Sequence, residues 1–378
     1  MTISRVNLVN CRNHKEINLN FSKDINIIIG NNGTGKTSIL EAISLVSTLR
    51  SPRGSLINQI ITNEENMMVI EAEIINKNGE KTIRLVCYKN GEKKISINGR
   101  ELKKATELLG IFKTVFLSLD DISLVNGSPQ NRRRFLDIIL MQSSNTYKDN
   151  LNNYIEVLRQ KNRLIKEIIE SEAKKEELDI WDERIAFYGA KIIDERYKII
   201  NNIKWLIKGM YDKLYGNKET LNVSYFSSIS FKNEGLEEVK KIENAYEKLL
   251  QQIQLNRQKE LKLGMAIIGP HRDDIQIKIN NNKVTGYAST GQERSILISF
   301  KMAEIEYFKK IDGEYPVILV DDCFVELDKE RKKIIWNEIE NKTQVILVST
   351  DKREYAGEKK DLFMYELLDT RREKICTN

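Results

Sequence analysis

The sequence has few cysteines, few prolines and no long apolar run. Its 4 cysteines lie far apart and form no C-x-x-C pair, which argues against a zinc site and against a disulfide framework. No stretch approaches the roughly 18 apolar residues that a membrane-spanning helix requires, and the first residues contain no apolar core of signal-peptide length. We therefore exclude the membrane-spanning and secreted classes and expect a cytoplasmic protein.

Charges of the two signs are nearly balanced. Lysine and arginine number 61 and aspartate and glutamate 55, which leaves a net charge of +6. An excess of this size is compatible with binding a polyanion such as nucleic acid, but only the placement of the charges can favour that partner. At 378 residues the chain is long enough for roughly two or three domains.

The first 128 residues have a mixed α/β pattern. Alternating apolar residues predict strands over Ile3–Leu8 and Ile17–Phe21, and an unbroken apolar run predicts a buried strand over Ile25–Ile29. A helix is predicted from Lys36 to Ser47. Three further strands are predicted over residues 67–74, 83–88 and 95–97. An Asn-Gly pair predicts a hairpin between the last two.

Proline is absent from Arg132 to Lys262, and the pattern there becomes helical. Apolar residues recur on one helical face over 151–169 and on another over 181–206, which predicts two antiparallel helices of about 25 residues, or ~38 Å each. We interpret both faces as core packing. A third helix is predicted over 236–261, after a strand over 221–231. Strands over 275–279, 317–320 and 345–348 then restore the α/β pattern, so the predicted domains are 1–128, 129–263 and 264–378.

The segment GNNGTGKT fits the phosphate-loop pattern G-x-x-x-x-G-K-[ST] and lies between a predicted strand and a predicted helix. Glycines let backbone N–H groups turn toward phosphate oxygens, and the helix N-terminus adds its positive end. Lys36 is expected to reach the β- and γ-phosphates of ATP and to act in catalysis, and Thr37 to bind Mg²⁺. The residues predicted to bind the nucleotide here are Gly30, Asn31, Asn32, Gly33, Thr34, Gly35, Lys36 and Thr37.

Two adjacent acids end the apolar strand VILVDD. Asp321 is predicted as a Mg²⁺ ligand, and Asp322 as the catalytic acid that orients or deprotonates the attacking water. Lys36 and Asp321 are separated by most of the chain. The predicted ATP-binding domain is therefore split by the helical insertion, to which the nucleotide state would be transmitted.

The small-residue turn ASTGQER opens a long amphipathic helix. Ser289 and Gly291 lie at its N-terminus, which is a second anion site on the same chain. With one nucleotide per chain, two copies arranged head to tail would each place Ser289, Gly291 and Gln292 on the partner's γ-phosphate. The alternative is an ordinary helix cap.

The phosphate loop, the S-T-G-Q turn and the acid pair that begins at Asp321 resemble an ABC-type ATPase head. Four further stretches resemble the RecF family of bacterial recombination mediators: LVNGSPQNRRRFLD, GPHRDD, VLRQKNRLIK and WDERIAFYGAKII. The resemblance spans nearly the whole chain. It implies an α/β fold, an ABC-type P-loop ATPase head split in sequence by a mainly helical insertion.

The resemblance also implies an ATP-dependent homodimer with weak, DNA-stimulated ATPase activity. Its expected partners are duplex and gapped DNA without sequence preference, RecR, RecO and, indirectly, RecA, which it would help to load in gap repair and replication restart. It places Arg12 beside the nucleotide and makes Thr350 a candidate sensor of the γ-phosphate. The chain departs from the family pattern at Leu119 and at Val325. The departure at Val325 removes a hydroxyl near the dimer-facing loop of residues 326–328.

Basic residues of the insertion are the candidates for contact with the DNA backbone, because such contact needs only spaced cations. They are Arg159, Lys161, Arg163 and Lys166. The run Arg132–Arg134 is either a solvated helix face or a contact with the nucleotide or the facing lobe. His271 is expected in a polar loop rather than in a metal site.

Two other protein classes share the ATPase head. An SMC-like chromosome or break-repair ATPase would need hundreds of heptad residues with a hinge or a zinc hook, and the ATP-binding subunit of a transporter would need a membrane partner. A GTPase would need an N-K-x-D motif, whereas here Asn-Lys is followed by Thr343-Gln344.

Overall fold

The computed structural model describes residues 1–171, 173–216, 218–229, 242–321, 327–340, 342–350 and 362–367. The chain forms two compact units: unit 1 comprises Met1–Ile122 with Leu297–Asn378, and unit 2 comprises Ser123–Ile296. The first boundary lies close to the predicted one at residue 128. The second lies well beyond the predicted one at residue 263, so residues 264–296 pack with the insertion.

Unit 1 is built on two sheets that differ in strand direction. Among the described residues, an antiparallel sheet has the order β2-β1-β4-β5-β6-β7 and a parallel sheet the order β14-β3-β13-β12-β8. Strands β3, β8, β12 and β13 are buried along their whole length, as is typical of a covered parallel sheet. The strand bounds are β1 Thr2–Cys11, β2 His14–Asn20, β3 Ile25–Gly30, β4 Met67–Asn76, β5 Gly79–Tyr88, β6 Lys93–Ile97, β7 Arg100–Glu101, β8 Thr114–Ser118, β12 Val317–Asp321, β13 Val345–Ser349 and β14 Leu362–Leu367.

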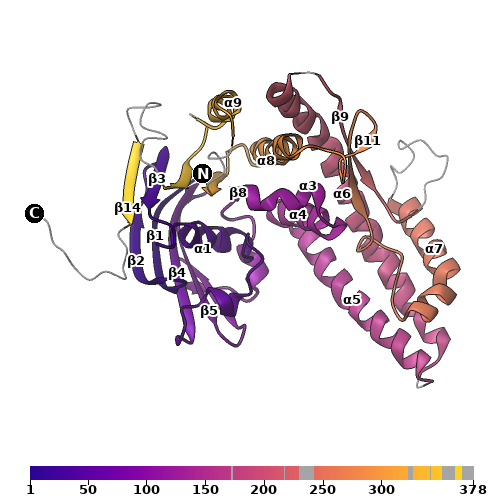
Figure 1. Ribbon diagram of the computed structural model, residues 1–378. Coiled ribbons are helices and arrows are strands. Elements are labelled where there is room, and N and C mark those ends of the chain that lie inside the picture. Colours follow the sequence, from indigo (N-terminus) through magenta and orange to yellow (C-terminus); the bar gives the residue numbers. More distant parts are fainter. Residues whose placement is uncertain are drawn as a thin grey trace, which may run out of the picture. The chain divides into compact units, whose positions relative to one another are not determined.

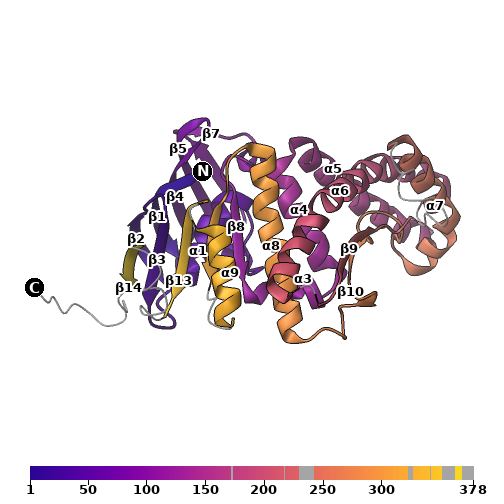
Figure 2. The same ribbon diagram turned by 90° about the horizontal axis from the view of Figure 1, so that it is seen from above.

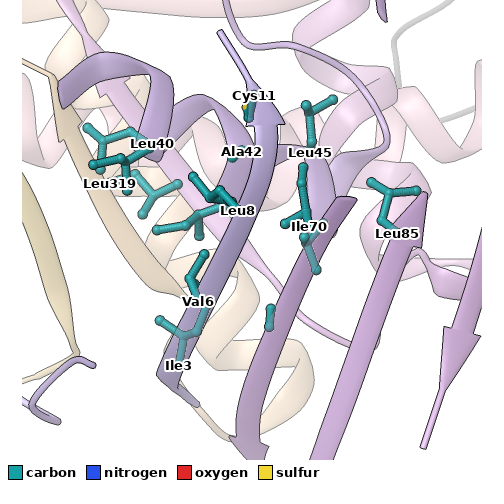
Figure 3. Packing of buried hydrophobic residues seen from close by; sticks show 14 of the residues in the cluster. Ile3, Val6, Leu8, Cys11, Leu40, Ala42, Leu45, Ile70, Leu85 and Leu319 are labelled. Atoms are coloured by element: carbon teal, nitrogen blue, oxygen red, sulfur yellow. The ribbon is translucent and has the colours of Figure 1, made fainter. Parts of the chain in front are cut away.

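Helix α1 (Lys36–Thr48) contacts strands of both sheets and joins them in one apolar core. Its Leu40 and Leu45 belong to the same cluster as Leu8 of β1 and Leu319 of β12 (Figure 3). This packing fixes the point at which β3 gives way to α1, and it confirms the predicted strand and helix there. The other helical segments of unit 1 are α2 Ile57–Ile60, η1 Ala105–Leu108, η2 Leu119–Ile122, α9 Lys329–Ile339 and the greater part of α8, Thr290–Asp312.

Unit 2 is mainly helical. Helices α5 (Asn145–Ile169) and α6 (Leu178–Tyr215) are antiparallel neighbours, and α7 (Ile242–Leu263) packs against both (Figures 1 and 2). The antiparallel pair is confirmed, but α6 has 38 residues, so the predicted length of about 25 was wrong. Four more buried residues continue its apolar face until Gly216 ends the helix with a φ of 78°: Ile207, Met210, Tyr211 and Leu214.

A small sheet of order β11-β10-β9 explains why residues beyond 263 belong to unit 2. Strand β10 (Asp274–Ile279) pairs antiparallel with β9 (Leu221–Phe226) and with β11 (Asn282–Lys283). The remaining elements of the unit are α3 Ser123–Asn126, α4 Pro129–Ser143 and η3 Lys175–Glu177. Within the described ranges, no helix has the length and apolarity that crossing a membrane requires.

A buried cation holds the three long helices of unit 2 together. Lys161 of α5 is fully buried, and its Nζ lies 2.9 Å from Asp182 of α6 and 2.7 Å from Glu260 of α7. Arg257 adds a second ion pair to Asp182, at 2.6 Å. The prediction that Lys161 contacts DNA was therefore wrong. Arg159, Arg163 and Lys166 do lie on the surface of α5.

We expect Lys161→Met to lower the free energy of unfolding of unit 2 by about 3–5 kcal/mol, because it leaves the buried Glu260 without its cation and Asp182 with Arg257 alone. Arg163→Met on the same helix is the matched control. Its ion pair with Glu167 is exposed, so the loss should stay below about 0.5 kcal/mol. Urea unfolding, followed by the fluorescence of Trp181 and Trp205 on α6, measures the free energy of unfolding of both variants. Equal losses would contradict the assignment.

A buried acid in unit 1 predicts a pH dependence of stability. Glu304 of α8 is 3% exposed, and burial raises its pKa from 4.5 to about 7, with Lys301 lowering and Asp121 raising it by smaller amounts. Between pH 4.5 and 7 the folded chain keeps this proton and the unfolded chain releases it, so stability falls as the pH rises through this window.

In the native chain we expect the free energy of unfolding to fall by an amount on the order of 3 kcal/mol between about pH 4.5 and 7. Glu304→Gln should abolish this fall, because the amide does not titrate. Thermal unfolding at pH 5 and pH 8 compares the variant with the native chain. Glu306→Gln, at an acid that is 38% exposed, serves as the control and should keep the native slope. A native slope in the Glu304 variant as well would refute the argument.

Candidate nucleotide-binding site

The phosphate loop connects the buried strand β3 to α1. Gly33 and Gly35 adopt the left-handed region, with φ of 85° and 92°, which a side chain would strain. Lys36 is buried, and its Nζ donates to the carbonyl oxygens of Gly30 at 2.7 Å and Asn31 at 2.9 Å. Asn32 and Thr34 complete the loop. Among the described residues no side chain caps the first turn of α1, so its N–H groups suit a phosphate.

The metal-binding residues predicted from the sequence meet at one edge of the parallel sheet. Thr37 Oγ1 donates to Asp321 Oδ1 at 2.8 Å. Asp321 ends β12, and β13 lies between β12 and β3, so the carboxyl ends of all three strands share this edge. Thr350 is exposed directly after β13, at the level of the phosphate loop. Asp322 and Val325 lie outside the described residues.

The donors at this edge fit a magnesium nucleotide. A hydroxyl and a carboxylate, from Thr37 and Asp321, are oxygen ligands of the kind that Mg²⁺ prefers. The loop amides and the Lys36 ammonium complement phosphate oxygens.

Arg12 lies against the helix that follows the phosphate loop. Its guanidinium donates from Nε and Nη2 to the carboxylate of the fully buried Glu41 at 2.9 and 3.1 Å, from Nη1 to the carbonyl of Gln59 and from Nη2 to the hydroxyl of Ser55. The side chain is therefore fixed on α1. Its predicted role beside the nucleotide stays a prediction.

The turn between β1 and β2 holds the phosphate loop, which the sequence did not predict. Asn13 Nδ2 donates to the carbonyl of Gly33 at 3.0 Å, and His14 Nε2 lies 3.0 Å from the carbonyl of Gly35. A Cβ on Gly35 would lie 2.4 Å from His14 Nε2. No motif marks these two residues, because strand pairing brings the turn to the loop.

The residues predicted to act on a partner's nucleotide, Ser289, Gly291 and Gln292, lie at the N-terminus of α8 in unit 2. Ser289 is exposed, and its N–H donates to Gln292 Oε1 at 2.7 Å. Gln292 N–H donates in return to Ser289 Oγ at 3.3 Å, so the two form a capping box. The alternative of a helix cap is therefore present at this turn, and the anion site stays a prediction.

The arginine run and the GPHRDD segment pair with each other inside unit 2. Arg132 is buried and forms a bidentate ion pair with Asp274, at 2.6 and 3.0 Å, and Arg133 donates to the carbonyl of Asp273. A solvated face was therefore the wrong alternative for Arg132. His271 contacts the Tyr154 hydroxyl and a backbone carbonyl in a polar loop, and burial lowers its pKa to about 4.

A parallel sheet with a phosphate loop after β3, an acid at the end of β12 and a serine-capped turn before α8 define a P-loop ATPase head of the ABC and SMC type. A family model described as RecF/RecN/SMC N terminal domain matches residues 2–368. The chain belongs to the RecF family.

Individual relatives cover almost the whole chain. The DNA replication and repair protein RecF of Clostridium botulinum (strain ATCC 19397 / Type A) is 36% identical over 350 residues, 93% of each chain, and that of Lachnospira eligens is 35% identical over 364 residues, 96% of each. A solved structure of the recombination mediator protein RecF-ATP in the RecFOR pathway is similar with a TM-score of 0.89 and 32% identity, covering 97% of this chain and 95% of that one. An Smc head with 17% identity and a TM-score of 0.52 shares the fold.

We expect Gly35→Ala to destabilise unit 1 in the absence of nucleotide more than Gly33→Ala does. Both positions have a positive φ, which costs a side chain about 1–2 kcal/mol. Only at Gly35 would the new methyl group also meet His14, and overpacking adds about 1–3 kcal/mol. Thermal unfolding measures both, and His14→Ala should remove the extra loss. Equal destabilisation would show that His14 does not confine the loop.

Proposed function

We propose that this protein is an ATP-dependent, DNA-binding recombination mediator that acts in gap repair and replication restart. The observation that carries the proposal is the contact of Thr37 with Asp321 beside the phosphate loop, in a chain of the RecF family. Relatives of this chain are named for DNA replication and repair, and a solved relative is described with ATP in the RecFOR pathway. RecR and RecO are therefore its proposed partners, and RecA an indirect one.

The proposed chemistry is hydrolysis of ATP with Mg²⁺. When bound, the magnesium nucleotide would supply a γ-phosphoryl group that water can attack, with ADP as the leaving group. Lys36 holds the phosphates from a buried position, and Thr37 and Asp321 provide oxygen ligands for the metal. Asp322 is proposed to orient or deprotonate the water. Its side chain is one methylene shorter than the glutamate common in ABC heads, so we propose weak, DNA-stimulated turnover.

Two copies are proposed to close head to tail on two nucleotides. Ser289 lies exposed at a helix N-terminus, and Ser289, Gly291 and Gln292 of each copy would face the γ-phosphate of the other. Moving the population from mostly open to mostly closed takes about 5 kcal/mol of differential binding. A few charge-assisted hydrogen bonds at each of two sites can supply this, and hydrolysis would remove them.

DNA is the proposed ligand of the insertion, without sequence preference and with duplex next to a gap as the favoured form. Arg159 and Arg163 are 72% and 76% exposed, and each pairs with a glutamate of its own helix. Such exposed pairs contribute little to stability, so a phosphate can take the place of the carboxylate.

Alternative functions fit the structure less well. An SMC-like chromosome or break-repair ATPase needs far longer helices than α5 and α6, which have 25 and 38 residues. The similarity to an Smc head shows the fold alone. A transporter subunit would need a membrane partner, whereas relatives that cover 93% and 96% of this chain are named for DNA replication and repair.

The proposal predicts opposite behaviour for two variants. Lys36→Ala should abolish ATP binding, because the phosphates lose their cation. Ser289→Arg should leave binding unchanged and prevent the ATP-dependent dimer, because arginine fills the place of the partner's phosphate. Fluorescent ATP titration and light scattering after gel filtration measure the two properties, with and without gapped duplex. Dimerisation of the Ser289 variant with ATP would contradict capping in trans.

A further inference from the structure

The side chain of Gln292 is held at both ends within unit 2. Its Oε1 accepts from the Ser289 N–H at 2.7 Å, and its Nε2 donates to Oε1 and Oε2 of Glu219 at 2.7 and 2.9 Å. The two partners fix the orientation of the amide, because a backbone N–H requires an oxygen and a carboxylate requires an N–H. The capping box of the ASTGQER turn, residues 288–294, which we call the signature turn, thus has a third member.

Glu219 is itself anchored by the long helix of the insertion. It lies between the end of α6 at Tyr215 and the start of β9 at Leu221. The hydroxyl of Tyr211 donates to Glu219 Oε2 at 2.8 Å, and the Tyr211 side chain is fully buried and stacks on Tyr215 at 5.4 Å between ring centroids. The carboxylate therefore accepts hydrogen bonds from α6 and from the signature turn at once.

This chain of contacts gives the signature turn its shape. Hydrogen bonds to a carboxylate are about twice as strong as neutral ones. Without Glu219, the Gln292 amide would lose its charged partner and could leave Ser289 for water. The first turn of α8 would then sample several conformations, and only some of them would present the Ser289 hydroxyl and the backbone N–H groups together to an anion.

We propose that Glu219 is a positioning residue for the signature turn, holding Gln292 so that the end of α6 and the first turn of α8 keep one geometry. The inference rests on the proposed contact of this turn with the nucleotide of a second copy. It assigns no catalytic role to Glu219. The helical insertion would bias closure of the dimer through one series of contacts, from α6 through Tyr211 and Glu219 to Gln292 and Ser289.

The test compares Glu219→Ala, Glu219→Gln and Tyr211→Phe with the native chain. Glu219→Ala should weaken the ATP-dependent dimer about tenfold or more while ATP binding to the single copy is unchanged, because charge-assisted bonds are lost at the turn only. Glu219→Gln keeps an acceptor oxygen and should retain most of the dimer. Tyr211→Phe should weaken the dimer about threefold.

The matched control is Glu183→Ala, which removes the same charge on α6 about 42 Å before Tyr211 along the helix and should dimerise as the native chain does. Light scattering over a range of protein concentrations gives the dimer constant, and thermal unfolding shows whether each variant is folded. If Glu219→Ala does not fold, Tyr211→Phe decides the question: a native dimer constant overturns the inference.

Measuring the native chain and Ser289→Arg in the same experiment separates the proposed function from the positioning role of Glu219. A native chain that does not dimerise with ATP contradicts the proposed function. If the native chain dimerises and Ser289→Arg does not, a native dimer constant for Glu219→Ala overturns the positioning role alone. Stronger dimers in both Glu219 variants would also overturn it, since they would show that the carboxylate repels the partner's phosphate instead of shaping the turn.

Discussion

The site depends on a hydrogen bond between two residues that are 284 positions apart, Thr37 and Asp321. A phosphate loop alone binds phosphate, and it needs an acid at the same edge to hold a metal. The acid reaches this edge because β3, β13 and β12 are parallel neighbours. Their continuous apolar sequence has no stable place except a covered sheet, and α1 covers it. Hydrophobic packing thus places the two oxygens.

Unit 2 achieves its geometry with buried charges. Pairs such as Lys161 with Asp182 and Glu260, or Arg132 with Asp274, lose hydration on folding, and their net contribution to stability is small. Their effect is on geometry. Apolar faces of long helices tolerate small rotations and shifts, whereas one cation between acids of two other helices is satisfied in a single register. Each ion pair joins residues of two different helices or strands, so each pair fixes the position of one element relative to another.

The sequence predicted those features that follow from local periodicity. The strand before the phosphate loop, α1 and the antiparallel helices were all visible in spacing alone. The burial of Lys161 was also readable: it lies seven residues after Tyr154 and four before Ile165, on the apolar face. Ile155 and Ile169, which belong to the apolar repeat over 151–169, are about half exposed. The clamp of His14 on Gly35 carries no local signal, since strand pairing creates it.

Each half of the proposed ATP site is held by a turn of its own unit. The β1–β2 turn grips the carbonyl oxygens of the phosphate loop through Asn13 and His14, and the α6–β9 turn grips the signature turn through Glu219. Neither turn supplies a group that must bind nucleotide. Both limit the number of conformations of the site before assembly, so less conformational freedom is lost when the dimer forms. Because ordering a site opposes binding, halves that are ordered beforehand allow more of the contact energy to favour the dimer. The proposed dimer, which would open and close on one γ-phosphoryl group at each of two sites, depends on this order, since few contacts carry the switch.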